Sequence, residues 1–392
     1  MAANCKPKLL HINTVADQCN SVGAIMNSIV AYARSAGCDA RIGAGRSDVS
    51  SVDFPIGGVV SVMAHVAASR LDDCEGWWSK RATAKFLKAI DEWDPDIVHL
   101  HNLHGHYINI PMLFDWLEAR KLPVVLTLHD CWWLTGHCSF YNHLDCSPID
   151  GCVDCRYHRD EYPISFISRS ARNFRRKHEL LNRRMKLKIV VPSQWTADRL
   201  NDSGLGHFSV NVIPHGIEIG EFSSHHTDGI HETVLAVAAR WEKRKNLEAV
   251  NNLAESGLCK APITVVGHLM GQTLHENIMY HPQIDSRGQM AGLYSTAAVL
   301  LNPSISETFG LTALEAMAAG TPVIVNADSA ISEIVTPECG IATDVNDTSN
   351  LAKIVNDIMA NRDRFNPKAV AARYTSTLMA ERYMELYRSL IG

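Results

Sequence analysis

Residues 304–322 read SISETFGLTALEAMAAGTP and lie between two short apolar runs, 297–302 and 323–325. Both runs have the length and composition of buried strands. The stretch between them predicts a loop followed by a helix, which its Gly-Thr-Pro end terminates. Gly310 has no side chain, so a ligand can approach the loop backbone closely. The helix that begins beside it offers unpaired N–H groups and a partial positive charge, which suit a phosphate.

Two carboxylates flank this phosphate site, Glu307 in the loop and Glu315 about one turn into the helix. An acid does not bind a phosphate, but a carboxylate accepts two O–H bonds side by side. The pair therefore suits a ligand that carries a diphosphate, a ribose diol and a hexose with vicinal hydroxyls, as a nucleotide-sugar does. The alternative is that Glu307 caps a turn and that Glu315 is a solvated acid of the first helical turn.

The composition is that of a globular protein long enough for two domains. The chain has 392 residues, of which 46% are hydrophobic and 20% charged. No apolar run approaches the roughly 20 residues that span a membrane, and no apolar segment of signal-peptide length lies near the N-terminus, so we expect a cytoplasmic protein. The net charge of −5 argues against general nucleic-acid binding.

The beginning of the chain predicts a second phosphate-binding turn. A strand over 8–13 is followed by a polar loop that contains Gly23 and by a helix over 24–36. Only one glycine is present where the dinucleotide fingerprint has three. An ordinary helix entry is therefore the alternative.

Basic residues follow the first strand of the second half. The buried strand over 234–239 ends in cations at 240 and 243–245. Because the carboxyl ends of parallel strands face the ligand crevice, these cations suit a diphosphate. The alternative is a solvated basic turn.

Together these motifs resemble those of retaining glycosyltransferases with the GT-B fold, in family 4. The 304–322 stretch is similar to the family's E-x7-E signature, and Arg240 and Lys245 match its Gly-Arg-x4-Lys pattern, with Ala239 in place of the glycine. The resemblance implies an α/β fold of two Rossmann-like domains that face an inter-domain cleft. The implied parts are an acceptor-side domain over 1–214 with a Cys-rich insertion at 131–163, a linker over 215–232, a nucleotide-sugar donor domain over 233–372, and a C-terminal helix over 373–392 that packs back on the first domain.

The same resemblance assigns roles to residues. It implies that Glu307 binds the donor sugar, that Glu315 binds the ribose, and that the backbone at Gly267 meets the base. The implied donor-binding set is Gly23, Gly267, Glu307, Thr308, Phe309, Gly310, Leu311 and Glu315. The implied catalytic set is His129, Arg240, Lys245 and Glu307.

The implied reaction moves a sugar, with retention, from a UDP- or GDP-linked donor to a saccharide or lipid-linked saccharide in bacterial surface polysaccharide synthesis. The departing diphosphate takes the acceptor proton, so neither a protein nucleophile nor a metal cofactor is required. One alternative is a GT-B-fold nucleotide-sugar epimerase. Another is a non-catalytic, zinc-dependent binding module.

A buried strand over 124–128 ends in His129 and Asp130. The resemblance places this histidine near the transferred sugar, whereas a structural histidine that bonds the next loop is the alternative. Asp130, Trp132 and Trp133 are expected on the acceptor side, where the two indoles would form a platform.

Five cysteines lie between 131 and 155, and residues 152–155 form a C-x2-C motif. Four thiolates can hold a structural zinc that staples a loop with little regular pattern. The predicted ligands are Cys138, Cys146, Cys152 and Cys155. Reduced cysteines without a metal are the alternative. Glycosyltransferases of the colanic-acid type have a similar Trp-Trp-Leu-Thr-Gly-His-Cys run.

Histidines at 99, 101, 104 and 106 suggest a metal site or a polar lining of the crevice. A catalytic metal normally also needs a carboxylate or an ordered second shell. Asp94 and Asp96 do not supply one, because they precede a strand over 97–100 rather than follow it.

The segment 169–188 is strongly basic, and its pattern is helical. A solvated helix face is one interpretation. The other, which the resemblance favours, is a peripheral contact with the anionic inner membrane.

Overall fold

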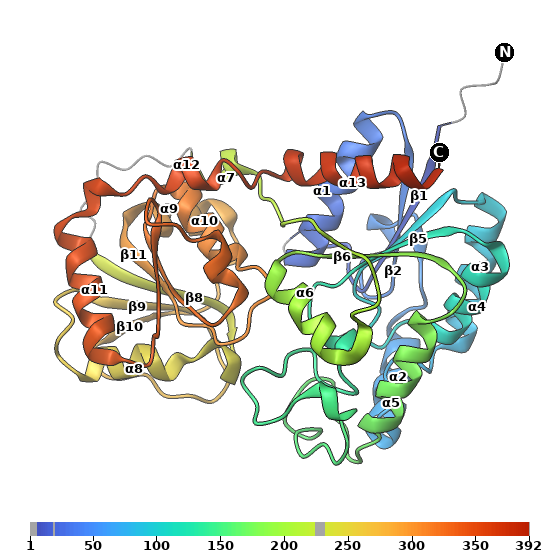
Figure 1. Ribbon diagram of the computed structural model, residues 1–392, viewed down its shortest axis with the longest axis horizontal. Coiled ribbons are helices and arrows are strands. Elements are labelled where there is room, and N and C mark those ends of the chain that lie inside the picture. The colour runs from blue at the N-terminus through green and yellow to red at the C-terminus, as the bar shows by residue number, and fades with distance from the viewer. Residues whose placement is uncertain (1–5, 19, 224–231, 392) are drawn as a thin grey trace. The chain divides into compact units, whose positions relative to one another are not determined.

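The computed structural model describes residues 6–18, 20–223 and 232–391 (Figure 1). They fall into two compact units, one within residues 1–141, 145–214 and 379–392, and the other within 142–144 and 215–378. Most of the predicted linker, 224–231, lies outside the described residues.

The first unit is built on a seven-stranded parallel sheet of order β3-β2-β1-β4-β5-β6-β7. This is the strand order of a Rossmann sheet, and it reverses between β1 and β4. Both faces of β4 are buried, and its residues are apolar apart from His99. The strands are β1 Lys8–Asn13, β2 Asp39–Ala44, β3 Phe54–Pro55, β4 Ile97–Leu100, β5 Pro123–Thr127, β6 Lys186–Val191 and β7 Val210–Val212.

Helices connect these strands and cover the sheet. They are α1 Ser21–Ser35, α2 Val59–Asp72, α3 Lys80–Trp93, α4 Ile110–Arg120, α5 Ser170–Leu181 and α6 Gln194–Leu200. The C-terminal helix, α13 Ser376–Ile391, lies beside α1 (Figure 1), where Tyr32 Oη donates a hydrogen bond to Glu381 Oε1 at 3.3 Å. The predicted return of the last helix to the first unit is confirmed.

The second unit repeats the pattern with six parallel strands, in the order β10-β9-β8-β11-β12-β13. The strands are β8 Thr233–Trp241, β9 Ile263–Leu269, β10 Ile278–His281, β11 Ala297–Asn302, β12 Val323–Asn326 and β13 Gly340–Thr343. The helices are α7 Ile219–Ser223, α8 Leu247–Glu255, α9 Arg287–Thr296, α10 Leu311–Ala319, α11 Thr348–Ala360 and α12 Pro367–Ala371. Leu235 packs in one hydrophobic layer and Val234 and Ala236 in the other, so both faces of the sheet are covered.

The predicted fold class is confirmed, because both sheets are parallel α/β sheets of the Rossmann type. The single helix expected over the basic segment 169–188 is wrong. Helix α5 ends at Leu181, and β6 begins at Lys186. Lys186 and Lys188 therefore belong to a strand.

Candidate active site

The predicted residues of the second unit gather at the carboxyl ends of β8, β9 and β11. β8 lies between the other two, and the strand order reverses between β8 and β11. Ligands of open α/β sheets bind at such a reversal. The cationic segment 240–245 lies at the carboxyl end of β8, and the segment 304–311 follows β11.

The carboxylate of Glu307, which is 13% exposed, joins these two segments. Lys245 Nζ donates to Glu307 Oε1, and Arg244 Nη1 lies 3.8 Å from Glu307 Oε2. The backbones are tied as well, since Ile305 N donates to Arg244 O at 2.8 Å. Burial alone would raise the pKa of Glu307, but the charges of Lys245 and Arg244 outweigh it and lower that pKa. Glu307 is therefore an anion held between two cations.

The start of α10 requires a glycine. Gly310 is the N-cap at φ +100°, and no side chain caps the helix there. A Cβ atom at this position would lie 2.5 Å from Ile331 Cγ1. Phe309 is buried, with its ring 5.3 Å from that of His215 and 5.9 Å from that of Tyr374. These contacts fix the loop so that the first amides of α10 face the end of the sheet.

Glu315 sits in a different environment from Glu307. Tyr294 Oη donates to Glu315 Oε2 at 3.1 Å. Burial raises the pKa of Glu315 to about 7, against the lowering effects of this hydrogen bond and of Arg287. Near neutral pH, Glu315 is thus divided between a carboxylate and a carboxylic acid.

Arg240 owes its position to a register shift between β8 and β9. The shift falls between Val237 and Arg240, opposite Gly267, which has φ +121°. A Cβ atom on Gly267 would lie 1.6 Å from Ala238 O, so only glycine permits this close approach. Arg240 is exposed, and its Nη2 lies 3.3 Å from Met270 Sδ. Its guanidinium is directed to solvent at the end of the strand.

In the first unit, the corresponding reversal lies between β1 and β4, near His129. His129 is buried, and its Nε2 is hydrogen-bonded to His101 Nδ1 at 2.9 Å. Asp130 Oδ2 is 2.7 Å from His104 Nε2, and Asp130 Oδ1 accepts from Trp132 N at 2.9 Å. The His-Asp step is thus held by side chains from the loop after β4.

Gly23 does not lie in the expected loop. It belongs to the first turn of α1, where its amide donates to the Asn20 side chain at 3.1 Å. A Cβ atom on Gly23 would lie 2.1 Å from Asp17 O. The glycine therefore permits close packing of the chain before the helix, and its own N–H is engaged by the cap.

The tryptophans expected as an acceptor platform are buried, at 1% exposure for Trp132 and 4% for Trp133. Lys177 Nζ lies 3.4 Å from the Trp132 ring centre and donates to Trp132 O at 2.6 Å. Trp133 packs against Phe114, with ring centres 5.7 Å apart. Neither indole presents an open face in this structure.

The four predicted zinc ligands share one loop but differ in exposure. Cys138 is buried, Cys152 and Cys155 are half-buried, and Cys146 is exposed. A hydrogen bond from Cys138 lowers the pKa of Cys155 to about 5. Burial raises the pKa of Cys146 to about 11, and the nearby thiols of Cys152 and Cys155 add to that effect. The four thiols are therefore close enough to shift one another's pKa values electrostatically.

Two sets of three ligand atoms lie within 4.8 Å of one another in the described residues, and neither contains a cysteine. One is His11, His99 and His101, and the other is His65, Glu75 and His106. The four histidines at 99, 101, 104 and 106 thus do not form one cluster. Asp94 pairs with Arg120, and Asp96 accepts from Lys8 N, so both acids serve structural contacts.

Sequence reasoning missed several residues of these sites. Arg244 and Tyr294 contact the two signature acids, and Glu75 binds the loop after β4 through the amides of Gly105 and His106. Burial alone would raise the pKa of Glu75, but His106 lowers it to about 2. The basic turn at 243–245 did carry a signal for Arg244.

Comparison with known families now bears on this geometry. Residues 25–221 match the model described as Glycosyltransferase Family 4, and residues 231–375 match that of Glycosyl transferases group 1. The chain belongs to glycosyltransferase family 4. It is therefore a glycosyltransferase of the EC 2.4 class, and the non-catalytic binding module is wrong. Enzymes of this family generally do not need a metal cofactor.

Among curated relatives, the putative colanic acid biosynthesis glycosyl transferase WcaC of Escherichia coli K12 is 24% identical over 76% of this chain and 77% of its own length. The Escherichia coli O-antigen biosynthesis glycosyltransferase WclY is 30% identical over 32% of this chain and 35% of its own. Among solved structures, sucrose-phosphate synthase from Thermosynechococcus elongatus has a TM-score of 0.71 at 16% identity, over 98% of this chain and 99% of its own. Anabaena HepE in complex with UDP-glucose has a TM-score of 0.66 at 16% identity, over 98% and 100%. These structures share the GT-B fold.

The raised pKa of Glu315 predicts how stability depends on pH in this family 4 enzyme. Because the pKa is about 7 in the folded chain and 4.5 when unperturbed, folding takes up a proton between these values. The contribution of Glu315 to stability is present below about pH 4.5 and is lost as the pH rises through 7. Glu315→Gln stays neutral, so its stability advantage should grow from near zero at pH 4.5 to about 1–3 kcal/mol at pH 8.

Urea denaturation at a series of pH values measures this difference. Glu255→Gln is the matched control, because Glu255 is an exposed residue at the end of α8. A pH-independent difference between wild type and Glu315→Gln would contradict the environment described for Glu315.

Proposed function

We propose that this glycosyltransferase moves a sugar, with retention of anomeric configuration, from a nucleoside-diphosphate sugar to a saccharide or lipid-linked saccharide of a bacterial surface polysaccharide. The observation that carries the proposal is the Lys245–Glu307–Arg244 cluster beside the start of α10, at the strand reversal of the second unit. The names of WcaC and WclY support the pathway class. The HepE complex with UDP-glucose supports the donor class.

In this proposal, the diphosphate binds Arg240, Lys245 and the first amides of α10. Arg240 reaches it as a planar fork and Lys245 as a point charge. Glu307 accepts hydroxyl groups of the sugar, and Glu315 binds the ribose diol. Glu307 is already ionised and anchored, so it needs little reorganisation when the donor binds.

The bond between the anomeric carbon and the diphosphate breaks, and the acceptor oxygen bonds to that carbon on the same face. The acceptor proton goes to the departing diphosphate. The enzyme then has to stabilise negative charge on that group, which Arg240, Lys245 and the helix amides are suited to do. We assign His129 a hydrogen bond to the transferred sugar. No step uses a metal ion.

Removing either cation tests the diphosphate role. We expect Arg240→Ala and Lys245→Ala each to lower kcat by about 10²–10³-fold, since each removes charge that stabilises the leaving group. Lys243→Ala is the matched control, because Lys243 is an exposed cation of the same turn. Sugar transfer is measured with UDP- and GDP-linked donors that raise the melting temperature of the wild type.

Near wild-type turnover in both variants would refute the assignment. Losses of equal size in Lys243→Ala would show that the effect is not specific to the two signature cations. Product analysis in the same assay separates transfer from epimerisation, which would release an altered sugar nucleotide without using an acceptor.

We also propose a structural zinc at Cys138, Cys146, Cys152 and Cys155. Supporting observations are the hydrogen bond between the thiols of Cys138 and Cys155 and the mutual charge effects among the four. The hydrogen bond from Cys138 lowers the pKa of Cys155 and so favours its thiolate, the form that binds zinc. The ion would draw the thiols together and hold the loop.

Metal analysis tests this proposal. We expect about one zinc ion per chain in the purified wild type, and loss of that ion in Cys152→Ser and Cys155→Ser, since four thiolates form a closed zinc site. Cys259→Ser should keep the zinc, because Cys259 is a half-buried thiol of the second unit. A wild-type protein that contains no zinc after purification without chelators would contradict the proposal.

A third proposal is that α2 and α5 contact an anionic bilayer. No helix in the described part of the chain is long and apolar enough to cross a membrane, so contact would be peripheral. α2 exposes Val59, Val60 and Met63 at 76%, 83% and 67%. Phe166, exposed at 59%, is tied to this helix through its amide, which donates to Arg70 O at 2.7 Å.

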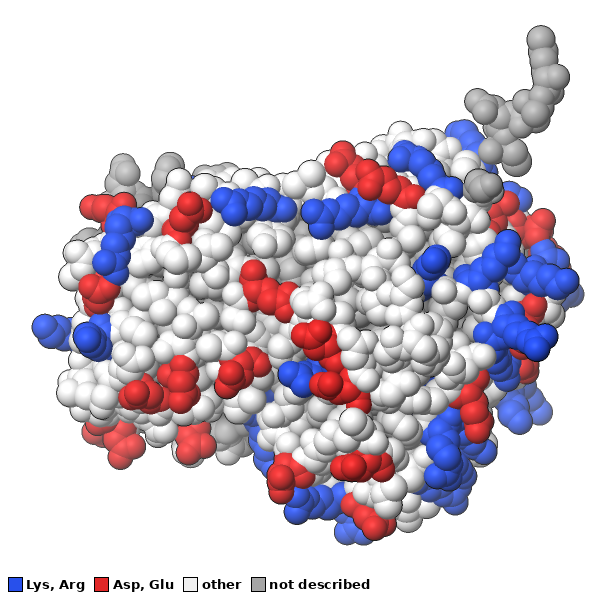
Figure 2. Space-filling model, viewed as in Figure 1, with Lys and Arg blue, Asp and Glu red and all other residues white. Residues whose placement is uncertain are grey.

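Basic residues border this apolar surface. Figure 2 shows Lys and Arg side chains gathered on the first unit over α5, where Arg169 and Arg175 are exposed. Apolar side chains bordered by cations suit the surface of an anionic bilayer. Two cations of the predicted basic segment 169–188 do not belong to this surface, because Lys177 is buried and Arg183 pairs with Asp115 at 2.6 Å.

Vesicle flotation tests the membrane contact. We expect binding to phosphatidylglycerol vesicles but not to phosphatidylcholine vesicles, and a roughly tenfold loss in Phe166→Asp or Arg175→Glu. Leu258→Asp is the control, since Leu258 is an apolar residue exposed at 51% on the second unit. Equal binding to both kinds of vesicle, or equal losses in the control, would contradict an electrostatic and apolar contact at this surface.

A further inference from the structure

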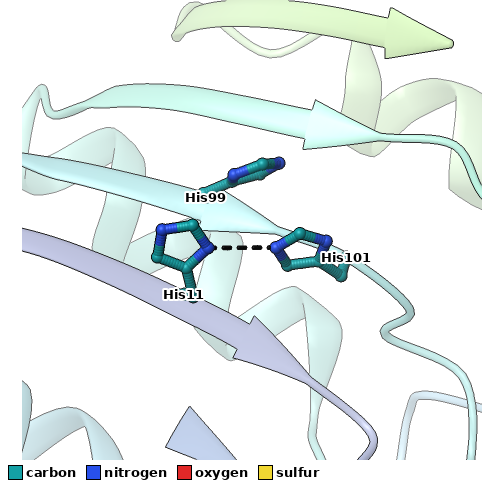
Figure 3. Close-up of side chains that lie close together, drawn as sticks. All are labelled: His11, His99 and His101. Atoms are coloured by element: carbon teal, nitrogen blue, oxygen red, sulfur yellow. Dashed lines mark hydrogen bonds between the residues drawn. The ribbon is translucent and has the colours of Figure 1, made fainter. Parts of the chain in front are cut away.

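Buried histidines converge beneath the reversal point of the first sheet. His11 of β1 pairs in register with His99 of β4, and His101 follows directly after that strand. Figure 3 shows the three rings turned toward one another, with the hydrogen bond that joins His11 to His101. The exposed fractions of the three side chains are 0–1%.

A hydrogen-bonded file of rings runs from His11 through His101 to His129. His11 Nδ1 is 3.1 Å from His101 Nε2, and His101 Nδ1 is 2.9 Å from His129 Nε2. Successive rings are stacked, with interplanar angles of 20° and 22°. Each bond joins an Nδ1 atom to an Nε2 atom, so the protonation of one ring constrains that of the next.

His99 stands beside the file and has its own partners. Its Nδ1 is 2.6 Å from Tyr387 Oη, and its Nε2 is 2.8 Å from Thr127 Oγ1. Burial lowers the pKa of His11 to about 3 and that of His99 well below its ordinary value. Both rings are therefore neutral near pH 7, with one N–H donor and one acceptor nitrogen each.

The inner end of the file decides its direction. His11 Nε2 is buried and has no hydrogen-bond partner. If His11 donates from Nδ1, its Nε2 carries no proton and is a bare lone pair. If His11 accepts at Nδ1, its Nε2 carries the proton and is a buried N–H without an acceptor, which native structures rarely contain. The favoured direction is donation from His11 to His101, and from His101 to His129.

We propose that His11 and His101 are positioning residues that hold the proton of His129 on Nδ1. His129 Nε2 then accepts the hydrogen bond from His101, and its Nδ1–H is a donor for an oxygen atom. The link from this donor to the transferred sugar rests on the proposed function, whereas the proton position does not.

A metal ion bound by His11, His99 and His101 fits these contacts less well. Their ligand atoms lie within 4.8 Å of one another, but both nitrogens of His99 and both of His101 already take part in hydrogen bonds. Of the six ring nitrogens in this trio, His11 Nε2 is the one without a partner. A metal ion would have to displace several hydrogen bonds that His99 and the file already make.

Nuclear magnetic resonance of the full chain with ¹⁵N-labelled histidine tests the proposal, because protonated and bare ring nitrogens resonate far apart. In the wild type near pH 7, we expect His129 to be protonated at Nδ1 and bare at Nε2. His11→Phe keeps a ring but removes the donor, so the Nδ1-protonated form of His129 should fall to a minor population. His11→Asn keeps an amide donor near the Nδ1 position and should restore it.

Tyr387→Phe is the matched control. It removes a buried hydroxyl from His99, outside the file, and should leave His129 unchanged. A wild-type His129 protonated at Nε2 or at both nitrogens would overturn the proposal without any variant. So would a stoichiometric metal ion that shifts the ring signals of the trio.

Activity separates this inference from the proposed function. We expect kcat for sugar transfer to fall about tenfold in His11→Phe and to recover in His11→Asn. If the proton positions are as expected but no nucleotide-sugar supports transfer, the proposed function fails and the role of His11 and His101 stands. If transfer proceeds but His129 keeps its proton on Nδ1 in His11→Phe, the role of His11 and His101 fails and the proposed function stands.

Discussion

The largely enclosed carboxylate of Glu307, held between Lys245 and Arg244, is the contact on which the second unit's site depends. It joins the segment after β8 to the segment after β11, and the strand order reverses between these two strands. Burying such a group is costly, and a charged cluster of this kind contributes little net stability. Its value is positional, because it fixes two loops that have no regular hydrogen-bonded ladder of their own. The start of α10 is thereby held in one orientation.

The two units use the same sheet topology for different electrostatics. At the reversal of the second sheet, cations and acids form ion pairs, and the residues remain charged. At the reversal of the first sheet, buried imidazoles are joined by hydrogen bonds, and burial lowers the pKa of His11 and His99. A neutral imidazole costs less to bury than a charge, and a hydrogen-bonded file of rings can pass orientation from one ring to the next. One sheet thus supplies charge and the other supplies directed hydrogen bonds.

Much of the fold could be predicted, because strands covered on both faces are mostly apolar runs. The bounds predicted for β1, β4 and β11 match the structure. α2 gave no such signal, since it buries His65 and Ser69 and exposes Val59 and Val60. Its pattern is the inverse of an ordinary amphipathic helix, so the hydrophobic period does not reveal a helix over residues 59–72.

The candidate site was predictable where one motif holds adjacent residues, and not where partners come from distant strands. The pairing of His11 with His99 depends on strand register, which no local period reveals. Lys177 is one cation among many in a basic helix, and its burial depends on carbonyl groups of the cysteine loop. Its place in the core follows from tertiary contacts alone. At Gly23 the sequence left a phosphate-binding turn and an ordinary helix entry open, and in the structure the Asn20 side chain accepts the hydrogen bond from the Gly23 amide.

The contrast between the two signature acids follows from what each one faces. Glu307 meets two cations and is held as an anion, whereas Glu315 meets a phenol and apolar packing and keeps a raised pKa. An anion can only accept hydrogen bonds, but a carboxyl group near its pKa can accept or donate. When their environments shift the pKa values of two carboxyl groups in opposite directions, the two groups are suited to different tasks. In the proposed function, Glu307 is suited to a fixed pair of sugar hydroxyls, and Glu315 can adjust its proton to whichever oxygen atom of the ribose diol approaches it.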